Sequence, residues 1–212
     1  RQKSMSELIF YTNPMSRGRI ARWMLEEVGV PYRTEILRFE TSMKSPAYRL
    51  INPMAKVPAI KHGDTIVTEA AAICAYLADA FPGANLAPTP KSRGLYYRWM
   101  FFAAGPLEMA ASMTAMGFEV PKEKLRMAGC GSYADVMNTL ERAVSENRFI
   151  AGDLFTAADV YVGAHVGWGL QFGTIEKRPA FIDYLAHLTE RPAFKRAAQL
   201  DEEAAKDMKA TD

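Results

Sequence analysis

The segment Asn-Pro-Met-Ala-Lys-Val-Pro-Ala-Ile at residues 52–60 constrains the fold more than any other part of the sequence. It contains two prolines and runs into the turn-forming His62-Gly63-Asp64, which is typical of a loop that enters a short strand. A cis peptide bond is cheap only before proline. A cis bond between Val57 and Pro58 would turn the Val57 N–H and C=O outward, where an extended peptide ligand can pair with them. Taken alone, Pro58 indicates no more than an ordinary loop, since most X–Pro bonds are trans.

Composition bounds the class of protein. With 212 residues, 49% of them hydrophobic and 24% charged, the chain is typical of a soluble globular protein with one large or two modest domains. The net charge is only +2, and acidic and basic residues are mixed, so no field of one sign favours nucleic acid or an anionic membrane as a partner. The two cysteines form no Cys-x-x-Cys and no His/Cys cluster at metal spacing, so we expect neither a disulfide nor a zinc site.

The lack of a membrane or export signal favours the cytoplasm. No apolar run approaches the ~20 residues that cross a bilayer. The start Arg1-Gln2-Lys3-Ser4 lacks the apolar segment of a signal peptide. These four residues are either native or a tag remnant in front of a native Met5.

The first eighty residues have the periodicities of a βαβ unit followed by a hairpin and a helix. Apolar runs of strand length alternate with apolar residues at helical spacing, and Asn, Pro and Gly stand between them. Two strands joined by a helix are parallel, whereas a glycine turn joins antiparallel strands. The expected elements are a strand at 8–11, a helix at 20–28 ended by Gly29, a strand at 30–37, a short helix at 46–50, a hairpin at 59–67 and a helix that opens at 68–70.

The second half of the chain has helical signals only. Residues 93–116 are apolar over most of their circumference, which predicts a buried helix, and Pro106 should kink it by removing one hydrogen bond. Pro121 is placed to begin the next helix. Thr156 and Asp159 have the spacing of a capping box, in which a hydroxyl and a carboxylate satisfy first-turn N–H groups.

Two motifs resemble those of the cytosolic glutathione transferases. Asn52-Pro53-Met54-Ala55-Lys56-Val57-Pro58, followed by Thr68-Glu69-Ala70 and the helical Ile73-Cys74-Ala75-Tyr76-Leu77, is similar to the glutathione-binding half of that family. Residues 149–160, which contain the capping box, resemble a motif of its second half. The break at Phe81-Pro82-Gly83 and the helical second half also stand in the family's order, so the likeness covers nearly the whole chain.

The resemblance implies a thioredoxin-like α/β domain at 5–83, a linker at 84–91 and an all-helical domain at 92–212, in a homodimer. It implies glutathione as the co-substrate, no metal, and conjugation of the glutathione thiol to a small apolar electrophile presented by the helical domain. Glutathione-dependent peroxidases, isomerases and dehalogenases share the first domain, so these activities stay open. A non-catalytic glutathione-binding or scaffold protein also stays open.

Ser16 is the predicted catalytic residue, and Tyr11 competes with it. By itself Ser16 is an ordinary N-cap for the helix that follows. A thiol held near a helix N-terminus meets free N–H groups and partial positive charge, which lower its pKa from about 8.5 toward neutrality. The resemblance implies that Ser16 faces the glutathione sulfur, although in another branch of the family a tyrosine near the end of the first strand does so. Asn13 is a third candidate, because its amide can donate to the sulfur or to the ligand backbone.

The resemblance assigns the γ-glutamyl and backbone contacts to two other stretches. Val57 and Pro58 supply the edge that pairs with the peptide backbone, and Glu69 meets the γ-glutamyl amine. Ala70 stands where the family has Ser, which removes a hydroxyl. Its backbone N–H, at a helix N-terminus, can still receive the γ-glutamyl carboxylate.

The glycine carboxylate of glutathione needs a cation. Met43 stands where many relatives have a His for this contact. Because methionine cannot pair with a carboxylate, the resemblance leaves this role to Lys44 or Lys56.

In the second half, the plain explanation of the apolar residues is a helical core. The resemblance adds that the kinked helix lines the electrophile pocket and faces a twin subunit. Methionine suits a pocket for varied apolar molecules because it adapts its shape. The residues expected to line this pocket are Phe102, Met109, Met113, Trp168 and Phe172.

Overall fold

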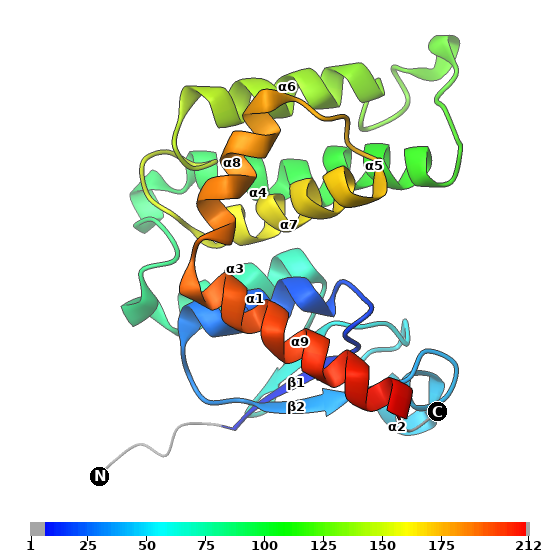
Figure 1. Cartoon of the computed structure of the whole chain (residues 1–212), viewed down its shortest axis with the longest axis vertical. Helices are drawn as coiled ribbons and strands as arrows, with labels where there is room; N and C mark the ends of the chain where they lie inside the picture. The colour runs from blue at the N-terminus through cyan, green and yellow to red at the C-terminus, as the bar shows by residue number, and fades with distance from the viewer. Residues whose placement is uncertain (1–6, 211–212) are drawn as a thin grey trace. The chain divides into compact units, whose positions relative to one another are not determined.

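The computed structural model describes residues 7–210, whose contacts group into two compact units. Residues 7–84 and 192–210 form the first unit, and residues 85–191 form the second. The expected start at Met5 lies outside the described residues. The first unit contains β1 (Leu8–Thr12), α1 (Gly18–Val28), β2 (Arg33–Ile36), η1 (Ser42–Lys44), α2 (Pro46–Arg49), β3 (Ala59–His62), β4 (Thr65–Thr68), α3 (Ala70–Ala80), η2 (Pro82–Ala84) and α9 (Pro192–Ala210) (Figure 1).

The four strands form one mixed sheet in the order β2-β1-β3-β4. β1 and β2 are parallel, as the predicted βαβ unit requires, and β3 pairs antiparallel with both β1 and β4. The predicted strand at 30–37 is longer than β2, which comprises Arg33–Ile36, although the Leu37 N–H still donates to the Thr12 carbonyl of β1 at 2.8 Å. This arrangement is the thioredoxin-like α/β fold that the sequence predicts for the first half of the chain.

Helices lie on both faces of the sheet because the side chains of β1 alternate. Phe10 faces α1, where the Arg22 guanidinium lies 5.0 Å from the centre of its ring. Tyr11 faces the other side and packs against Tyr48 of α2, with ring centroids 5.6 Å apart. α1 ends as predicted at Gly29, which adopts the left-handed conformation with φ 73°.

The C-terminal helix α9 groups with the first unit, whereas the sequence analysis assigned 92–212 to one helical domain. It lies along α1 (Figure 1), and Arg22 Nε is 3.3 Å from Asp201 Oδ1 in a buried ion pair. Trp23 and Phe194 pack edge to face between the same two helices. These contacts explain why the end of the chain packs on the unit in which the chain begins.

The second unit is all-helical. The predicted helix at 93–116 is interrupted as expected at Pro106, which lies in a π-helical turn that accommodates the missing hydrogen bond. Within residues 7–210, every helix is too short or too polar to span a lipid bilayer. The elements of this unit are η3 (Pro90–Ser92), α4 (Gly94–Phe102), η4 (Ala103–Leu107), α5 (Glu108–Ala115), η5 (Lys122–Lys124), α6 (Tyr133–Glu146), α7 (Ala157–Phe172) and α8 (Pro179–Thr189).

The expectation that Pro121 begins the next long helix is wrong. Only the short 3-10 helix η5 follows Pro121, and α6 begins at Tyr133. Ser132 caps α6, since its Oγ accepts the Asp135 N–H at 3.1 Å. The two glycines at 129 and 131 keep the intervening segment from continuing as a helix.

The predicted capping box at the start of α7 is present and buried. Asp159 Oδ2 accepts the Thr156 N–H at 2.9 Å, and Oδ1 accepts the Ile150 N–H and the Tyr184 hydroxyl, each at 2.8 Å. Burial raises the pKa of Asp159 to about 6, although these donors act to lower it. The carboxylate therefore joins the segment before α7, α7 itself and α8, which is a structural role.

Candidate functional site

The first-unit residues assigned to glutathione meet at one end of the sheet. β3 lies between β1 and β4, and Ala59 at its start is paired with Tyr11 on one side and Thr68 on the other. The segment that follows β1, the Val57-Pro58 dipeptide before β3 and the Glu69-Ala70 pair after β4 are therefore neighbours. We call these three stretches (residues 11–16, 57–58 and 69–70) the sheet-end site.

Val57-Pro58 occupies the centre of the sheet-end site. The peptide bond between them is cis, the alternative in which the Val57 N–H and C=O turn outward. Val57 lies outside the strands, and none of the turn and loop hydrogen bonds among the described residues uses its N–H or C=O. Its backbone is therefore available to an extended ligand.

The loop before Val57 is held by two side chains that sequence reasoning missed. The Lys56 carbonyl accepts the Tyr48 hydroxyl at 2.7 Å and the Asn52 amide Nδ2 at 2.9 Å. Asn52 Oδ1 also accepts the Met54 N–H at 3.0 Å. Asn52 stands in the motif, but its two side-chain hydrogen bonds exist only in the folded loop.

Ser16 lies half-buried in the turn before α1, where its hydroxyl both donates and accepts. Ser16 Oγ donates to the Asn13 carbonyl at 2.6 Å and accepts the Gly18 N–H at 2.9 Å. The second bond satisfies one of the N–H groups at the start of α1, so the expected capping role is present two residues before the helix. The Asn13 carbonyl also accepts the Ser16 N–H at 3.1 Å.

The Asn13 amide is occupied by the protein itself. Its Nδ2 donates to the Leu37 carbonyl at 2.7 Å, and its Oδ1 accepts the Met15 N–H at 2.9 Å. The residue is 1% exposed. Its side chain therefore ties the turn after β1 to the end of β2, and the ligand role considered for Asn13 would have to use an amide that already has two partners.

Tyr11, the alternative to Ser16, is half-buried in an apolar cluster. It packs with Tyr48, Met43 and Val57. The ring therefore lies on the face of the sheet that α2 covers, at the same sheet end as Ser16. Burial raises the pKa of the neighbouring Tyr48 hydroxyl, and Tyr11 adds to that rise.

Glu69 adopts a backbone conformation that is rare for a side chain other than glycine. Its φ is 70° at the position just before α3, and its side chain is exposed. Such conformations cost of order 1–3 kcal/mol and cluster at functional sites. Ala70 follows as the first residue of α3, so its N–H belongs to the positive end of that helix.

Met43 and the two lysines considered for the glycine carboxylate differ in exposure. Met43 is 3% exposed and belongs to the apolar cluster around Tyr48, so it forms part of the core. The Lys44 ammonium donates to the Ala55 carbonyl at 3.1 Å, which places it at the loop before Val57. The Lys56 side chain is exposed in that same loop. Both cations are near the sheet-end site, because the loop that carries or contacts them leads directly into Val57.

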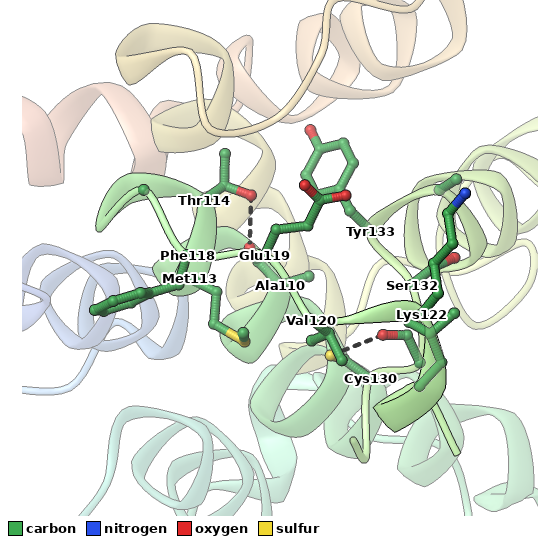
Figure 2. A pocket seen from close by; sticks show the side chains of 14 residues that line it. Ala110, Met113, Thr114, Phe118, Glu119, Val120, Lys122, Cys130, Ser132 and Tyr133 are labelled. Atoms are coloured by element: carbon green, nitrogen blue, oxygen red, sulfur yellow. Dashed lines mark hydrogen bonds between the residues drawn. The ribbon is translucent and has the colours of Figure 1, made fainter. Parts of the chain in front are cut away.

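The five residues expected in the electrophile pocket have different surroundings within the second unit. Met113 lines a cavity of about 550 Å³ (Figure 2), and Met109 lines another hollow of about 420 Å³. Phe102 packs edge to face against Trp99, with ring centroids 5.4 Å apart. Trp168 is half-buried and Phe172 is 71% exposed.

Gly18, which the sequence analysis did not single out, sets the distance between α1 and β1. A Cβ at this position would lie 1.9 Å from Thr12 Oγ1 and 3.0 Å from Ser16 Oγ. Any larger residue must therefore move the start of α1 and the Ser16 turn. A glycine at the first position of a helix was the only signal for this close approach.

We expect Gly18→Ala to lower the free energy of unfolding by roughly 1–3 kcal/mol, because the added methyl group overpacks this contact. Gly94→Ala is the matched control, since Gly94 is also the first residue of a helix and nothing lies within 4 Å of a Cβ there. Urea unfolding of both variants measures the difference. Equal stability of the two variants would show that α1 can shift without cost.

Among the described residues, 7–210, no group of three or more His, Cys, Asp or Glu side chains is placed to hold a metal ion. The sheet-end site and the loop before Val57 bring together hydroxyl, backbone and charged groups. These groups are a hydroxyl at a helix start, an open backbone edge, a second helix N-terminus with an exposed carboxylate beside it, and two lysines.

Comparison with known proteins agrees with this arrangement. Residues 15–80 match the family model for the glutathione S-transferase N-terminal domain. Glutathione S-transferase A of Pleuronectes platessa is 29% identical over 184 residues, which cover 81% of this chain and 82% of that protein. Glutathione S-transferase GstA of Escherichia coli O157:H7 is 27% identical, over 71% of this chain and 76% of that protein.

Solved structures extend the likeness to nearly the whole chain. The theta class glutathione S-transferase of Xanthomonas axonopodis pv. citri, solved with glutathione bound, is 25% identical with a TM-score of 0.72. The match covers 92% of this chain and 98% of that chain. The family model, the relatives and the shared fold lead to one conclusion: residues 15–80 match a glutathione S-transferase N-terminal domain, and the chain is similar to glutathione S-transferases in fold over nearly its whole length.

Proposed function

We propose that this protein is a glutathione transferase that binds glutathione at the sheet-end site and joins its thiol to small apolar electrophiles. The observation that carries this proposal is the convergence of the Ser16 turn, Val57-Pro58 and Glu69-Ala70 at one end of the sheet. A tripeptide with two carboxylates, one amine and one thiol needs a backbone edge, cations, an anion and a thiol-stabilising donor. The sheet-end site and the nearby Lys44 and Lys56 supply groups of each of these kinds.

Each contact has a physical basis in the first unit. The Val57 N–H and C=O pair with the cysteinyl backbone, as in strand addition. Glu69 holds the γ-glutamyl amine, and the Ala70 N–H at the start of α3 receives the γ-glutamyl carboxylate. Lys44 or Lys56 pairs with the glycine carboxylate.

Activation of the thiol requires the Ser16 hydroxyl to change partners. Its single hydrogen points to the Asn13 carbonyl, so donation to the glutathione sulfur breaks that bond. The carbonyl keeps the Ser16 N–H as a donor, which limits the cost of the change. The thiol then loses its proton to solvent, and the thiolate is stabilised by the hydroxyl and by the nearby start of α1.

The conjugation step forms one S–C bond. The thiolate attacks an electron-poor carbon, and the leaving group departs with its electron pair or, in an addition, the adjacent carbon takes up a proton. Holding both reactants close together supplies part of the acceleration, and stabilisation of the thiolate supplies the rest. We further propose that the chain acts as a cytoplasmic homodimer in detoxification, with Phe102, Met109, Met113, Trp168 and Phe172 as the residues to test for electrophile contacts.

The deciding experiment is calorimetric titration with glutathione, with the ultraviolet absorbance of the thiolate followed in the same samples. We expect saturable binding with the thiol ionised at neutral pH, followed by turnover of chlorodinitrobenzene or a related electrophile. Binding without turnover of any electrophile or peroxide would favour the scaffold alternative. No binding at all would overturn the proposal.

We expect Ala70→Ser to tighten glutathione binding by roughly 2- to 10-fold, because an added hydroxyl donor contributes about 0.5–1.5 kcal/mol. The neighbouring Ala71→Ser is the matched control, since it adds the same hydroxyl one residue further into α3. Calorimetry on both variants measures the dissociation constants. An unchanged constant for Ala70→Ser would mean that the γ-glutamyl carboxylate is not bound at the start of α3.

A further inference from the structure

Thr12 carries a hydroxyl that the fold buries without using it. Thr12 is the last residue of β1 and is 0% exposed. Its backbone is engaged, since its carbonyl accepts the Leu37 N–H at 2.8 Å. Its side-chain Oγ1, by contrast, has no hydrogen-bond partner among residues 7–210. A buried hydroxyl without a partner costs stability and is uncommon in native proteins, so this one requires an explanation.

The geometry of β1 directs the Thr12 hydroxyl toward the start of α1. Phe10 and Thr12 are two residues apart and therefore share one face of the sheet, the face that α1 covers. A Cβ built on Gly18, the first residue of α1, would lie 1.9 Å from Thr12 Oγ1 and 3.0 Å from Ser16 Oγ. The two oxygens are therefore at most about 5 Å apart, the greatest separation that these two distances from one point allow.

The Ser16 oxygen can accept one more donor. A hydroxyl oxygen has one hydrogen and two lone pairs. The Ser16 hydrogen goes to the Asn13 carbonyl at 2.6 Å, and one lone pair accepts the Gly18 N–H at 2.9 Å. These bonds leave the second lone pair of Ser16 Oγ open, and the Thr12 hydroxyl is a donor close by.

Packing alone does not explain a hydroxyl at position 12. Valine has nearly the shape of threonine and puts a methyl group, which needs no partner, in place of the hydroxyl. In this buried position next to α1, valine should be at least as stable as threonine. A group that lowers stability in this way is expected where function, and not folding, requires it.

We propose that Thr12 is a positioning residue for Ser16: when the Ser16 hydrogen turns from the Asn13 carbonyl to the glutathione sulfur, the Thr12 hydroxyl donates to Ser16 Oγ. This inference rests on the proposed function and deepens the role of Ser16 in it. The new bond satisfies the Thr12 hydroxyl and holds the Ser16 oxygen in place. It also makes Ser16 a stronger donor, because linked hydrogen bonds polarise one another. Since Thr12 is completely buried, it acts on the sulfur through Ser16 and not by contact.

Thr12→Val removes only this hydroxyl. We expect kcat/KM for conjugation of chlorodinitrobenzene to fall roughly three- to ten-fold, the contribution of one hydrogen bond. The acid limb of the pH–rate profile should move up by about 0.5–1 pH unit, because the bound thiolate loses part of its stabilisation. The midpoint of urea unfolding should stay the same or rise, since a methyl group needs no hydrogen-bond partner.

Thr12→Ser is the matched control, because it keeps the hydroxyl and removes a buried methyl group. Its urea midpoint should fall, while its rate and pH profile return to within about two-fold of the parent. The two variants therefore change stability and rate in opposite directions. If Thr12 only packs, Thr12→Val would match the parent in rate and pH profile and Thr12→Ser would be the slower variant, which would overturn the proposal.

The double variant of Thr12→Val and Ser16→Ala tests whether Thr12 acts through Ser16. If it does, the double variant should be as slow as Ser16→Ala alone, to within about two-fold. Losses that multiply in the double variant would mean that Thr12 acts independently of Ser16, and the proposal would be wrong.

The same measurements distinguish a failure of this proposal from a failure of the proposed function. A parent protein that binds glutathione and turns over the electrophile, with an unchanged rate and pH profile in Thr12→Val, contradicts only the role of Thr12. A parent that binds no glutathione contradicts both. Titration of the bound thiolate, followed by its ultraviolet absorbance, gives a readout besides turnover. Its midpoint in Thr12→Val should lie about 0.5–1 pH unit above that of the parent, and equal midpoints would contradict the proposal.

Discussion

Ser16→Ala is expected to lower kcat/KM for conjugation on the order of 100-fold, the usual loss when one donor to a developing or localised anion is removed. The variant removes the hydroxyl that can turn from the Asn13 carbonyl to the glutathione sulfur. The Kd for glutathione should change little, because the Val57 edge and the Glu69-Ala70 pair remain. Steady-state kinetics with chlorodinitrobenzene and calorimetry on the same preparation measure the two quantities.

Tyr11→Phe is the matched comparison, since it also removes one hydroxyl at the same end of the sheet. Its ring packs in the apolar cluster with Tyr48, and phenylalanine keeps that packing. We expect the Tyr11→Phe rate to stay within about three-fold of the parent, the effect of losing less than 1 kcal/mol. A larger loss in Tyr11→Phe than in Ser16→Ala would reverse the assignment.

The pH dependence of the Ser16→Ala rate adds a second readout. If Ser16 stabilises the thiolate, its removal raises the pKa of bound glutathione, and the rate of the variant recovers as pH rises toward about 8.5, the unperturbed thiol pKa. A merely structural loss would lower the rate by the same factor at every pH. Urea unfolding provides the control for stability, because Ser16→Ala also removes the acceptor of the Gly18 N–H.

Local sequence patterns predicted those parts of the first unit that depend on neighbours in the chain. The βαβ unit, the hairpin around Gly63 and the α1 stop at Gly29 follow from periodicity and turn residues. The cis bond at Val57-Pro58 follows from proline together with the motif around it. Each of these features depends on residues within a few positions of one another.

Contacts between distant residues were beyond such patterns. Arg22 and Asp201 are separated by 179 positions, so nothing local indicated that α9 packs on α1. The Asn52 and Tyr48 bonds to the Lys56 carbonyl likewise exist only once the loop is folded. The register that brings Ser16, Val57 and Glu69 to one sheet end was implied by the family resemblance, not by periodicity.

The sequence does contain a signal for the observed start of α6 at Tyr133, although Pro121 was expected to begin this helix. Ser132 and Asp135 have the N-cap and N3 spacing of a capping box, and the Asp135 N–H does bond to Ser132 Oγ. Pro121 suggested an earlier start because proline is favoured in a first helical turn. The Ser132 cap therefore fixes the start of α6, and Pro121 does not, because Gly129 and Gly131 disfavour a helix between the two.

The largest stability effect is expected at Asp159. Asp159→Ala leaves the Ile150 N–H, the Thr156 N–H and the Tyr184 hydroxyl without their buried acceptor. With roughly 1–3 kcal/mol for each of the three orphaned groups, the free energy of unfolding should fall by about 3 kcal/mol or more. Urea unfolding measures the change, and Asp153→Ala, at an exposed position before α7, is the control.

The raised pKa of Asp159 predicts how the stability of the protein changes with pH. Because burial raises its pKa from 3.8 to about 6, the folded protein binds this proton more tightly than the unfolded chain. The resulting stabilisation is complete below about pH 4 and is lost as pH rises through about 6, for a total of roughly 3 kcal/mol. Asp159→Asn cannot titrate, so the difference in unfolding free energy between the parent and this variant should shrink as pH rises from 5 to 7. A difference that stays constant from pH 5 to 7 and falls only below about pH 4 would mean that the three donors outweigh desolvation and hold the folded pKa below its ordinary value.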